Sequence, residues 1–225
     1  MKLSMALLFG SMRLSRGFFL NIPCTQHRAF AATPAALEDE VDPGEVSGLN
    51  ILKWPHPALR APNAEVESFD SDLKALSRRM FDLMYAAAGV GLAAPQVGIN
   101  KRVIVWNESG DKKKWLTEAV LVNPKIVDQS VKTEADQEGC LSFPGVPPES
   151  ERMVPRHTWI KVEAYNLKGK LFKKKYEGFE ARIFQHEYDH LDGKVYIDHL
   201  SAEHKAEIQE RLDELMTEHG PDGIL

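Results

Sequence analysis

The stretch ARIFQHEYDHLDG, residues 181–193, holds two histidines four positions apart, His186 and His190, with Glu187 directly after the first. In an α-helix, residues i and i+4 lie one above the other on the same face, so both imidazoles can reach one ion. Glu187 then lies beside the open position of that ion. A helix is expected here because glycines bracket a proline-free run that carries apolar residues. The stretch therefore predicts a metal-binding helix.

Two histidines make an incomplete metal site, so a third ligand must come from elsewhere in the chain. Cys140 lies in EGCLSFPG, where the neighbouring glycine and proline predict a tight, extended segment. A divalent cation deprotonates a nearby thiol, so Cys140 is a natural third ligand. The alternatives are a buried core cysteine and a helix whose histidines are exposed or satisfied by ordinary hydrogen bonds.

The chain of 225 residues has room for one catalytic domain with a full core and for tails. No stretch approaches the ~18 apolar residues that a membrane span requires. The two cysteines, Cys24 and Cys140, lie in different parts of the chain, which excludes a disulfide framework. We divide the chain into a leader (1–37), a linker (38–50), a catalytic domain (51–200) and a C-terminal helix with tail (201–225).

The first 37 residues have the composition of an organelle transit peptide, since they carry four cations and no acid. We expect import into an organelle, either mitochondrion or plastid. A secretory signal is the alternative, but its apolar run, Met5 to Phe9, is short and is followed by Arg13 and Arg16. Without the four cations, 24 basic residues face 33 acidic ones, a net charge of about −9. An acidic body is a poor general nucleic-acid binder.

The pattern of the remaining chain predicts an α+β fold, with antiparallel strands packed around the central metal-binding helix. Asp70 or Ser71 can cap a helix that runs to about Ala88. A proline-rich segment from Ile51 is expected to cross the domain surface in an extended form. Strands are expected at 102–106, 119–124, 159–166 with a hairpin return, and 195–197, and a final helix at 201–219.

The stretch GVGLAAPQVG, Gly89 to Gly98, is a third element of interest. Its first two glycines free the backbone to approach a ligand closely, and Gln96 offers an amide donor just beyond a run of small residues. The spacing is not that of a phosphate-binding loop, because no Gly-Lys-Ser/Thr follows.

Together the three segments resemble the peptide deformylase family. The motifs GVGLAAPQ (89–96), EGCLS (138–142) and QHEYDH (185–190) match its signatures in order and spacing. The similarity extends from about Ile51 to Leu200. The form EGCLSFPG resembles the bacterial and plastid branch, in which leucine follows Gly-Cys.

The resemblance implies a site for one divalent metal ion, with ferrous iron expected and zinc, nickel or cobalt able to take its place. Three protein ligands and a water in the fourth position suit a hydrolytic centre. Glu187 is implied to move the proton of that water to the departing amine. The implied metal ligands are Cys140, His186 and His190, the implied oxyanion donors are the Gln96 amide and the Leu141 backbone N–H, and the implied channel residues are Gly89, Val90, Gly91 and Gly139.

The reaction implied by the resemblance is hydrolytic removal of the formyl group from the N-terminal methionine of new, organelle-encoded chains, with release of formate. N-formylmethionyl nascent peptides are then the partners, and an organellar ribosome is a further candidate. A metalloprotease is a weaker alternative, because the cysteine ligand lies upstream of the helix. A catalytically inactive metal-binding or ribosome-associated module is the other alternative. Such a module would need neither Glu187 nor Gln96.

Overall fold

This computed structural model of the protein describes residues 48–146 and 153–220. The predicted leader, most of the predicted linker and the last five residues of the tail lie outside the described residues. The domain boundaries drawn from the sequence stay predictions. Among the helices of the described ranges, none combines the length and apolar character that a membrane crossing requires.

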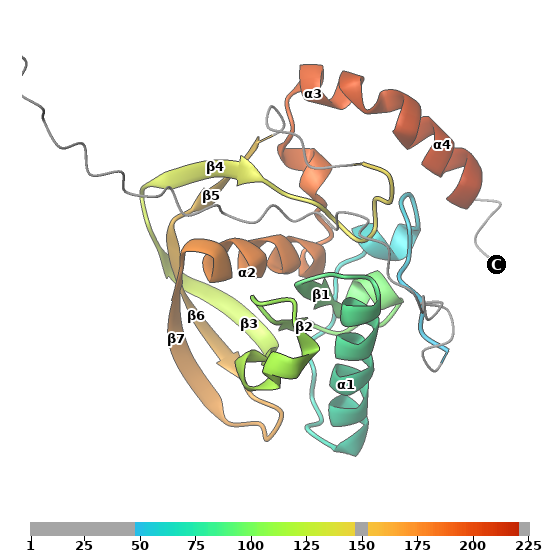
Figure 1. Ribbon diagram of the computed structural model, residues 1–225. Coiled ribbons are helices and arrows are strands. Elements are labelled where there is room, and N and C mark those ends of the chain that lie inside the picture. The colour runs from blue at the N-terminus through green and yellow to red at the C-terminus, as the bar shows by residue number, and fades with distance from the viewer. Residues whose placement is uncertain (1–47, 147–152, 221–225) are drawn as a thin grey trace, which may run out of the picture.

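In the described ranges, seven strands form two antiparallel sheets (Figure 1). The larger sheet has the order β1-β2-β3-β6-β7, and β4 pairs with β5 in a separate two-stranded sheet. In β6, Ile160, Val162 and Ala164 are fully buried and alternate with more exposed residues, as the period of a strand requires. The strands are β1 (Gly91–Ala93), β2 (Val103–Trp106), β3 (Ala119–Gln129), β4 (Thr133–Gln137), β5 (Met153–His157), β6 (Trp159–Tyr165) and β7 (Leu171–Glu177).

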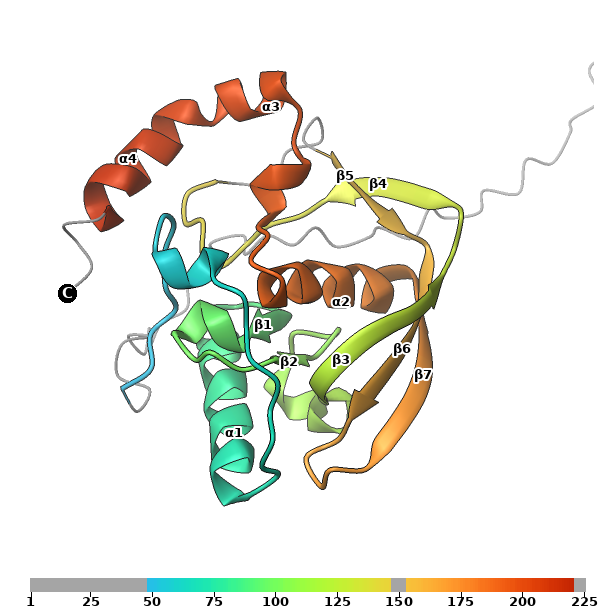
Figure 2. The same cartoon turned by 180° about the vertical axis from the view of Figure 1, so that it is seen from behind.

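The helix α2 (Gly178–Leu191) runs through the middle of the molecule, with the β4–β5 sheet on one side and the large sheet on the other (Figures 1 and 2). It follows β7 directly. Trp106 of β2 meets Tyr176 and Phe184 edge-on, with ring centroids 5.2 and 6.1 Å apart, and this aromatic cluster fixes the helix on the sheet. The predicted fold class, an α+β fold with antiparallel strands around a central helix, is confirmed.

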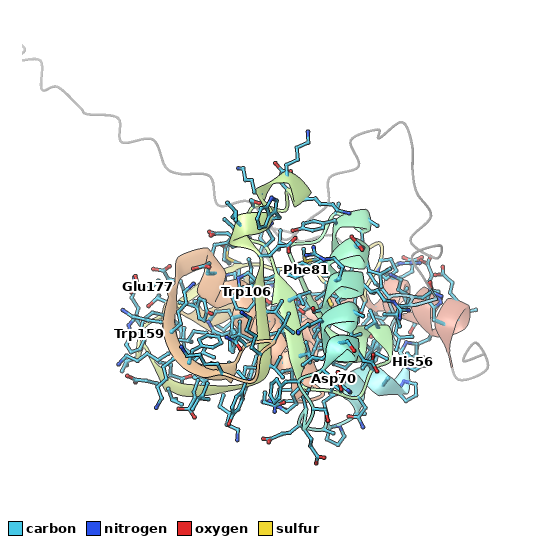
Figure 3. All side chains as sticks on the ribbon, turned by 90° about the horizontal axis from the view of Figure 1, so that it is seen from below. His56, Asp70, Phe81, Trp106, Trp159 and Glu177 are labelled. Carbon is cyan, nitrogen blue, oxygen red and sulfur yellow. The ribbon has the colours of Figure 1, made fainter. Side chains whose placement is uncertain are left out.

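The helix α1 (Ser71–Ala86) lies against the β1–β2 end of the large sheet. Asp70 caps it, because its carboxylate accepts the Leu73 N–H at 3.0 Å. Figure 3 shows Asp70 beside one end of this helix and Trp159 and Glu177 together on the far side of the molecule. Trp159 and Glu177 are register partners in the β6–β7 pair.

The segment after Ile51 is more deeply embedded than the sequence indicated. Ile51, Leu59 and Val66 are buried, so the prediction of a surface segment is wrong for these residues. Its prolines start a short 3₁₀ helix, Pro57–Arg60, which turns Leu59 into the core. Within residues 48–146 and 153–220, three other 3₁₀ helices span Ala94–Val97, Lys112–Thr117 and Tyr196–His199.

The predicted strand at 195–197 is wrong, because these residues enter the last of those 3₁₀ helices. The Asp198 carboxylate accepts the Val195 N–H at 3.0 Å and closes the turn. The predicted helix at 201–219 is divided into α3 (Ala202–Glu207) and α4 (Gln209–His219). Ile208 lies between the two helices, as the C-cap of α3 and the N-cap of α4, and its side chain is buried.

The helix α4 packs on the domain through one apolar stripe. Its Leu212 and Leu215 join a cluster that contains Phe143, Val146 and Tyr196. Arg211 adds a hydrogen bond from Nε to the Pro144 carbonyl at 2.9 Å. The C-terminal helix is thereby attached to the loop that follows Cys140.

We expect Leu215→Ala to lower the free energy of unfolding by about 2–5 kcal/mol, since Leu215 is fully buried and truncation leaves a cavity. The neighbouring Met216 is 47% exposed, so Met216→Ala should change that free energy by less than about 0.5 kcal/mol. Urea unfolding of the two variants measures the difference. Equal midpoints would mean that α4 does not contribute to the core in solution.

Candidate metal centre

The structure brings together the three residues that the sequence predicted as metal ligands. The donor atoms of Cys140, His186 and His190 all lie within 4.8 Å of one another. The Cys140 Sγ and His190 Nε2 atoms are 3.4 Å apart. The two histidines come from successive turns of α2, and Cys140 comes from the irregular segment after β4. These three residues form a Cys/His/His site.

A buried carboxylate orients the first histidine. Glu138 Oε2 lies 2.9 Å from His186 Nδ1, which directs the other ring nitrogen toward Cys140. Arg156 donates to both Glu138 oxygens at 2.8 and 2.9 Å, and Arg182 donates to one at 2.9 Å. Burial opposes the charge of Glu138, but the Arg156 guanidinium outweighs it and holds the pKa of this carboxyl well below its ordinary value.

The donor set fits a divalent cation. One sulfur and two imidazole nitrogens are the ligands that leave a fourth, open position in hydrolytic centres. Burial lowers the pKa of His190 to about 3, so its ring is neutral and has a lone pair to donate. Burial also opposes the charge of His186, yet Cys140 and Glu138 together raise its pKa well above the ordinary value. The surroundings therefore favour positive charge at His186 but not at His190.

Glu187 lies beside the three ligands and is almost fully buried, with 2% of its surface exposed. Within the described ranges its Oε2 atom has no hydrogen-bond partner. A Cβ atom on Gly91 would overlap the other oxygen, so only glycine leaves room for this carboxylate. Burial raises the pKa of Glu187 to about 7. The side chain is thus suited to exchange a proton near neutral pH.

Gln96 presents its amide nitrogen to the same place. Its Oε1 accepts the Ala93 N–H at 2.8 Å, which fixes the orientation of the amide. Its Nε2 donates to Ser142 Oγ at 3.3 Å and lies 3.8 Å from Cys140 Sγ. The backbone N–H of Leu141 makes no hydrogen bond with any residue in the part of the chain that the structure describes. Two donors are therefore gathered next to the ligands.

The glycines predicted to line a channel lie around these groups, with partly different roles. The Gly89 N–H donates to the Met84 carbonyl at 2.8 Å and is committed within the fold. A Cβ on Gly89 would lie 2.7 Å from Leu141 Cδ1, so this glycine lets two segments touch. Gly139 is buried directly before Cys140. The Val90 carbonyl accepts the Asn107 N–H at 2.9 Å.

A sequence model of the family described as polypeptide deformylase matches residues 49–206 of the chain. The chain belongs to the peptide deformylase family. The predicted resemblance is thereby confirmed, and the three motifs that carried it supply the three candidate metal ligands together with Glu187 and Gln96. An inactive module is not favoured, because Glu187 and Gln96 are both placed for chemistry.

Three relatives show the extent of the similarity. Peptide deformylase 1B, chloroplastic, from rice is 39% identical over 82% of this chain and 68% of the relative. Peptide deformylase 1B, chloroplastic/mitochondrial, from Arabidopsis thaliana is 43% identical over 74% of this chain and 59% of the relative. The chain thus spans about three fifths of the Arabidopsis protein. The crystal structure of peptide deformylase from Plasmodium falciparum superposes with a TM-score of 0.72 at 42% identity, covering 76% of this chain and 96% of that one.

Several residues that build this deformylase site received no role from the sequence. Glu138 and Asp189 stand inside the quoted motifs, and an acid within two residues of a candidate ligand is the signal that could have found them. Arg156 Nη1 donates to Asp189 Oδ2 at 2.6 Å, and His199 Nε2 lies 2.8 Å from the same oxygen. Arg156 and Arg182 carry no local signal, because only the fold brings them to Glu138.

We expect Glu138→Gln to lower the affinity for divalent metal roughly 10- to 100-fold, since partners that orient a metal-binding histidine typically contribute that much. Metal retained by the protein during titration with a competing chelator measures the change. Glu163→Gln is the matched control, because Glu163 pairs with Lys173 on the sheet. Equal retention by the two variants would contradict the role given to Glu138.

Proposed function

We propose that this chain removes the formyl group from the N-terminal methionine of newly made polypeptides and releases formate. The observation that carries the proposal is the buried Glu187 carboxyl, one oxygen of which has no partner among the described residues, beside a three-ligand site. A structural metal site needs no such group and closes with a fourth protein ligand. The relatives named peptide deformylase support the choice of a formamide as the substrate.

We propose that Cys140, His186 and His190 hold one ferrous ion, a site that zinc, nickel or cobalt can also occupy. Sulfur and imidazole ligands accept all of these ions. When bound, such an ion acts as a Lewis acid and lowers the pKa of water toward ~7. Proton transfer and stabilisation of the negative charge are assigned to the protein groups around the site.

Glu187 is assigned the proton transfers. Its carboxylate takes a proton from the attacking water and gives it to the amine nitrogen as the C–N bond breaks. The formyl carbon leaves as formate, and the peptide leaves with a free amino group. A pKa of about 7 matches both directions of transfer near neutral pH.

Gln96 and Leu141 are assigned to the carbonyl oxygen of the formyl group. This oxygen becomes negatively charged in the tetrahedral state, and donors that are already aimed at it lower the barrier. The Gln96 amide is fixed by Ala93, and the Leu141 N–H is uncommitted in the described ranges. Neither donor has to reorganise during the reaction.

The peptide that follows the methionine is assigned to the edge of β1. This strand is the last one in the large sheet, so its outer edge can accept an extended chain by strand addition. Gly89, Val90 and Gly91 lie at or beside this edge, and Gly139 directly precedes Cys140.

We further propose that the protein acts in an organelle, mitochondrion or plastid, on chains leaving the organellar ribosome. The leader-like composition of residues 1–37 and the chloroplastic and chloroplastic/mitochondrial plant relatives support this location. Bacterial-type translation in such organelles starts with formyl-methionine, which supplies the substrate.

The first test is formate release from a formyl-Met-Ala peptide by protein purified without oxygen and loaded with iron. We expect the unsubstituted chain to release formate and Glu187→Ala to release almost none while it keeps its metal, because the proton acceptor is gone. Glu210→Ala, an exposed change on α4, is the control for the lost charge. A metal-loaded wild type that releases no formate would overturn the proposed function.

We expect Gln96→Ala to lower kcat roughly 10²- to 10³-fold, the usual loss for one oxyanion donor, with the metal content unchanged. Gln209→Ala removes an amide that bonds only to Asp213 on the surface of α4 among the described residues and should leave kcat unchanged. Steady-state kinetics and metal analysis are made on the same samples. A Gln96→Ala protein that loses metal but turns over normally when saturated with it would refute this assignment.

A further inference from the structure

We propose that Lys53 is a positioning residue for deformylation: it holds the turn at Leu141 and places a positive charge at the peptide unit that follows Cys140 and Leu141. The inference rests on the proposed function. Lys53 lies outside all three motifs that identify the family, and nothing in its sequence neighbourhood marks it for chemistry. Its role emerges only from what the segment Leu52–Trp54 touches.

Three consecutive residues of this segment connect the two loops that carry the proposed oxyanion donors. The Leu52 N–H donates to the Gln96 carbonyl at 2.7 Å. The Trp54 N–H donates to the Ser142 carbonyl at 2.9 Å. Between them, the Lys53 ammonium donates to the Leu141 carbonyl at 2.9 Å. The segment therefore fixes the Gln96 loop and the Cys140 loop relative to each other.

The Lys53 hydrogen bond completes the restraint on one particular N–H. The peptide unit between Cys140 and Leu141 is planar, so the Cys140 carbonyl and the Leu141 N–H lie in one plane and point in opposite directions. The Phe143 N–H holds that carbonyl at 2.9 Å. Lys53 holds the next carbonyl, that of Leu141, so two successive peptide planes are fixed. The Leu141 N–H cannot turn away unless one of these two hydrogen bonds breaks.

The segment that carries Lys53 is itself immobilised by packing. Trp54 stacks on Phe143 with ring centroids 5.6 Å apart, and Phe143 meets Tyr196 edge-on at 5.2 Å. The Arg60 guanidinium also lies over the Trp54 ring, 5.0 Å from its centroid. The backbone of Lys53 is therefore fixed, which limits the positions that its ammonium can reach.

The charge of Lys53 adds an electrostatic effect to the hydrogen bond. The ammonium lies 2.9 Å from the Leu141 carbonyl, one residue after Cys140; burial lowers the pKa of Lys53, and the nearby Cys140 sulfur opposes this shift. In such a place a charge is screened less than on the surface. A fixed cation beside Cys140 and Leu141 favours negative charge on the sulfur and on the oxygen that the Leu141 N–H would bind.

The test compares Lys53→Met, Lys53→Gln and Lys53→Arg with a control, Lys132→Met, in the full-length, metal-loaded protein. Met keeps the apolar stem without a donor, Gln keeps a donor without the charge, and Arg keeps both. Lys132 makes an exposed pair with Glu134, so its loss should change nothing. We measure kcat and KM for formate release, the metal bound per chain, and the sulfur-to-cobalt charge-transfer band of the cobalt-loaded proteins.

We expect Lys53→Met to lower kcat roughly ten-fold or more, with KM changed by less than about two-fold and full metal content, because the lost interaction acts on the transition state. Lys53→Arg should recover most of kcat, and Lys53→Gln should lie between. The cobalt band should move to longer wavelength in the Met and Gln variants, since a sulfur without a nearby cation gives up its electron more easily.

The inference is overturned if Lys53→Met keeps kcat within about two-fold of wild type, or if its loss of kcat disappears once corrected for bound metal. An unmoved cobalt band in the Met and Gln variants would also overturn the electrostatic part. Failure of the proposed function looks different, because the wild type would then release no formate. The band shift would in that case still report whether Lys53 acts on Cys140.

Discussion

The buried carboxylate of Glu138 is the interaction on which the rest of the site depends. A charge that is removed from water is strongly unfavourable unless it is paired and hydrogen-bonded, and here Arg156 and Arg182 both pair with it. Arg156 comes from β5 and Arg182 from α2, so the small sheet is tied to the central helix through one acid. The same acid orients His186, so Glu138 both links the small sheet to the central helix and positions a candidate metal ligand.

The centre is assembled from segments that are far apart in sequence, and each one reaches it by a different means. The central helix brings its histidines by regular geometry. Cys140 lies on an irregular turn, which has to be held from outside by the Leu52–Trp54 segment on one side. On the other side, Arg211 of α4 bonds to the Pro144 carbonyl and Phe143 packs under the same helix. The two ends of the described chain thus brace the least regular part of the site.

The sequence predicted the parts of this site that follow from local spacing. Two histidines four apart on a helix must share a face, whatever the rest of the chain does. The helix α1 and the strands β2, β3, β6 and β7 likewise followed from the sequence pattern, whereas β1, β4 and β5 were not predicted. Arg156 and Lys53 could not be found in this way, because their partners are distant in the chain and no local pattern marks them. The prediction of a strand at 195–197 was wrong for the same reason. Three β-branched and aromatic residues favour a strand, but a strand also requires a neighbouring strand with which to pair, and the local sequence does not show one.

Glu187 shows why the surrounding network is so heavily paired. Glu187 is 2% exposed, and one of its oxygens has no hydrogen-bond partner within the described ranges, which lowers stability; the proposed proton transfers require that this oxygen stay unpartnered. Proteins accept such a conflict at functional positions when neighbouring interactions compensate for it. Here the compensation lies within one or two turns of α2, where His186, Arg182 and Asp189 all engage the charges around Glu138. Glu138 is thus fully paired, while the nearby Glu187 keeps one oxygen without a partner among the described residues, and the glycine at position 91 leaves room for the Glu187 carboxylate.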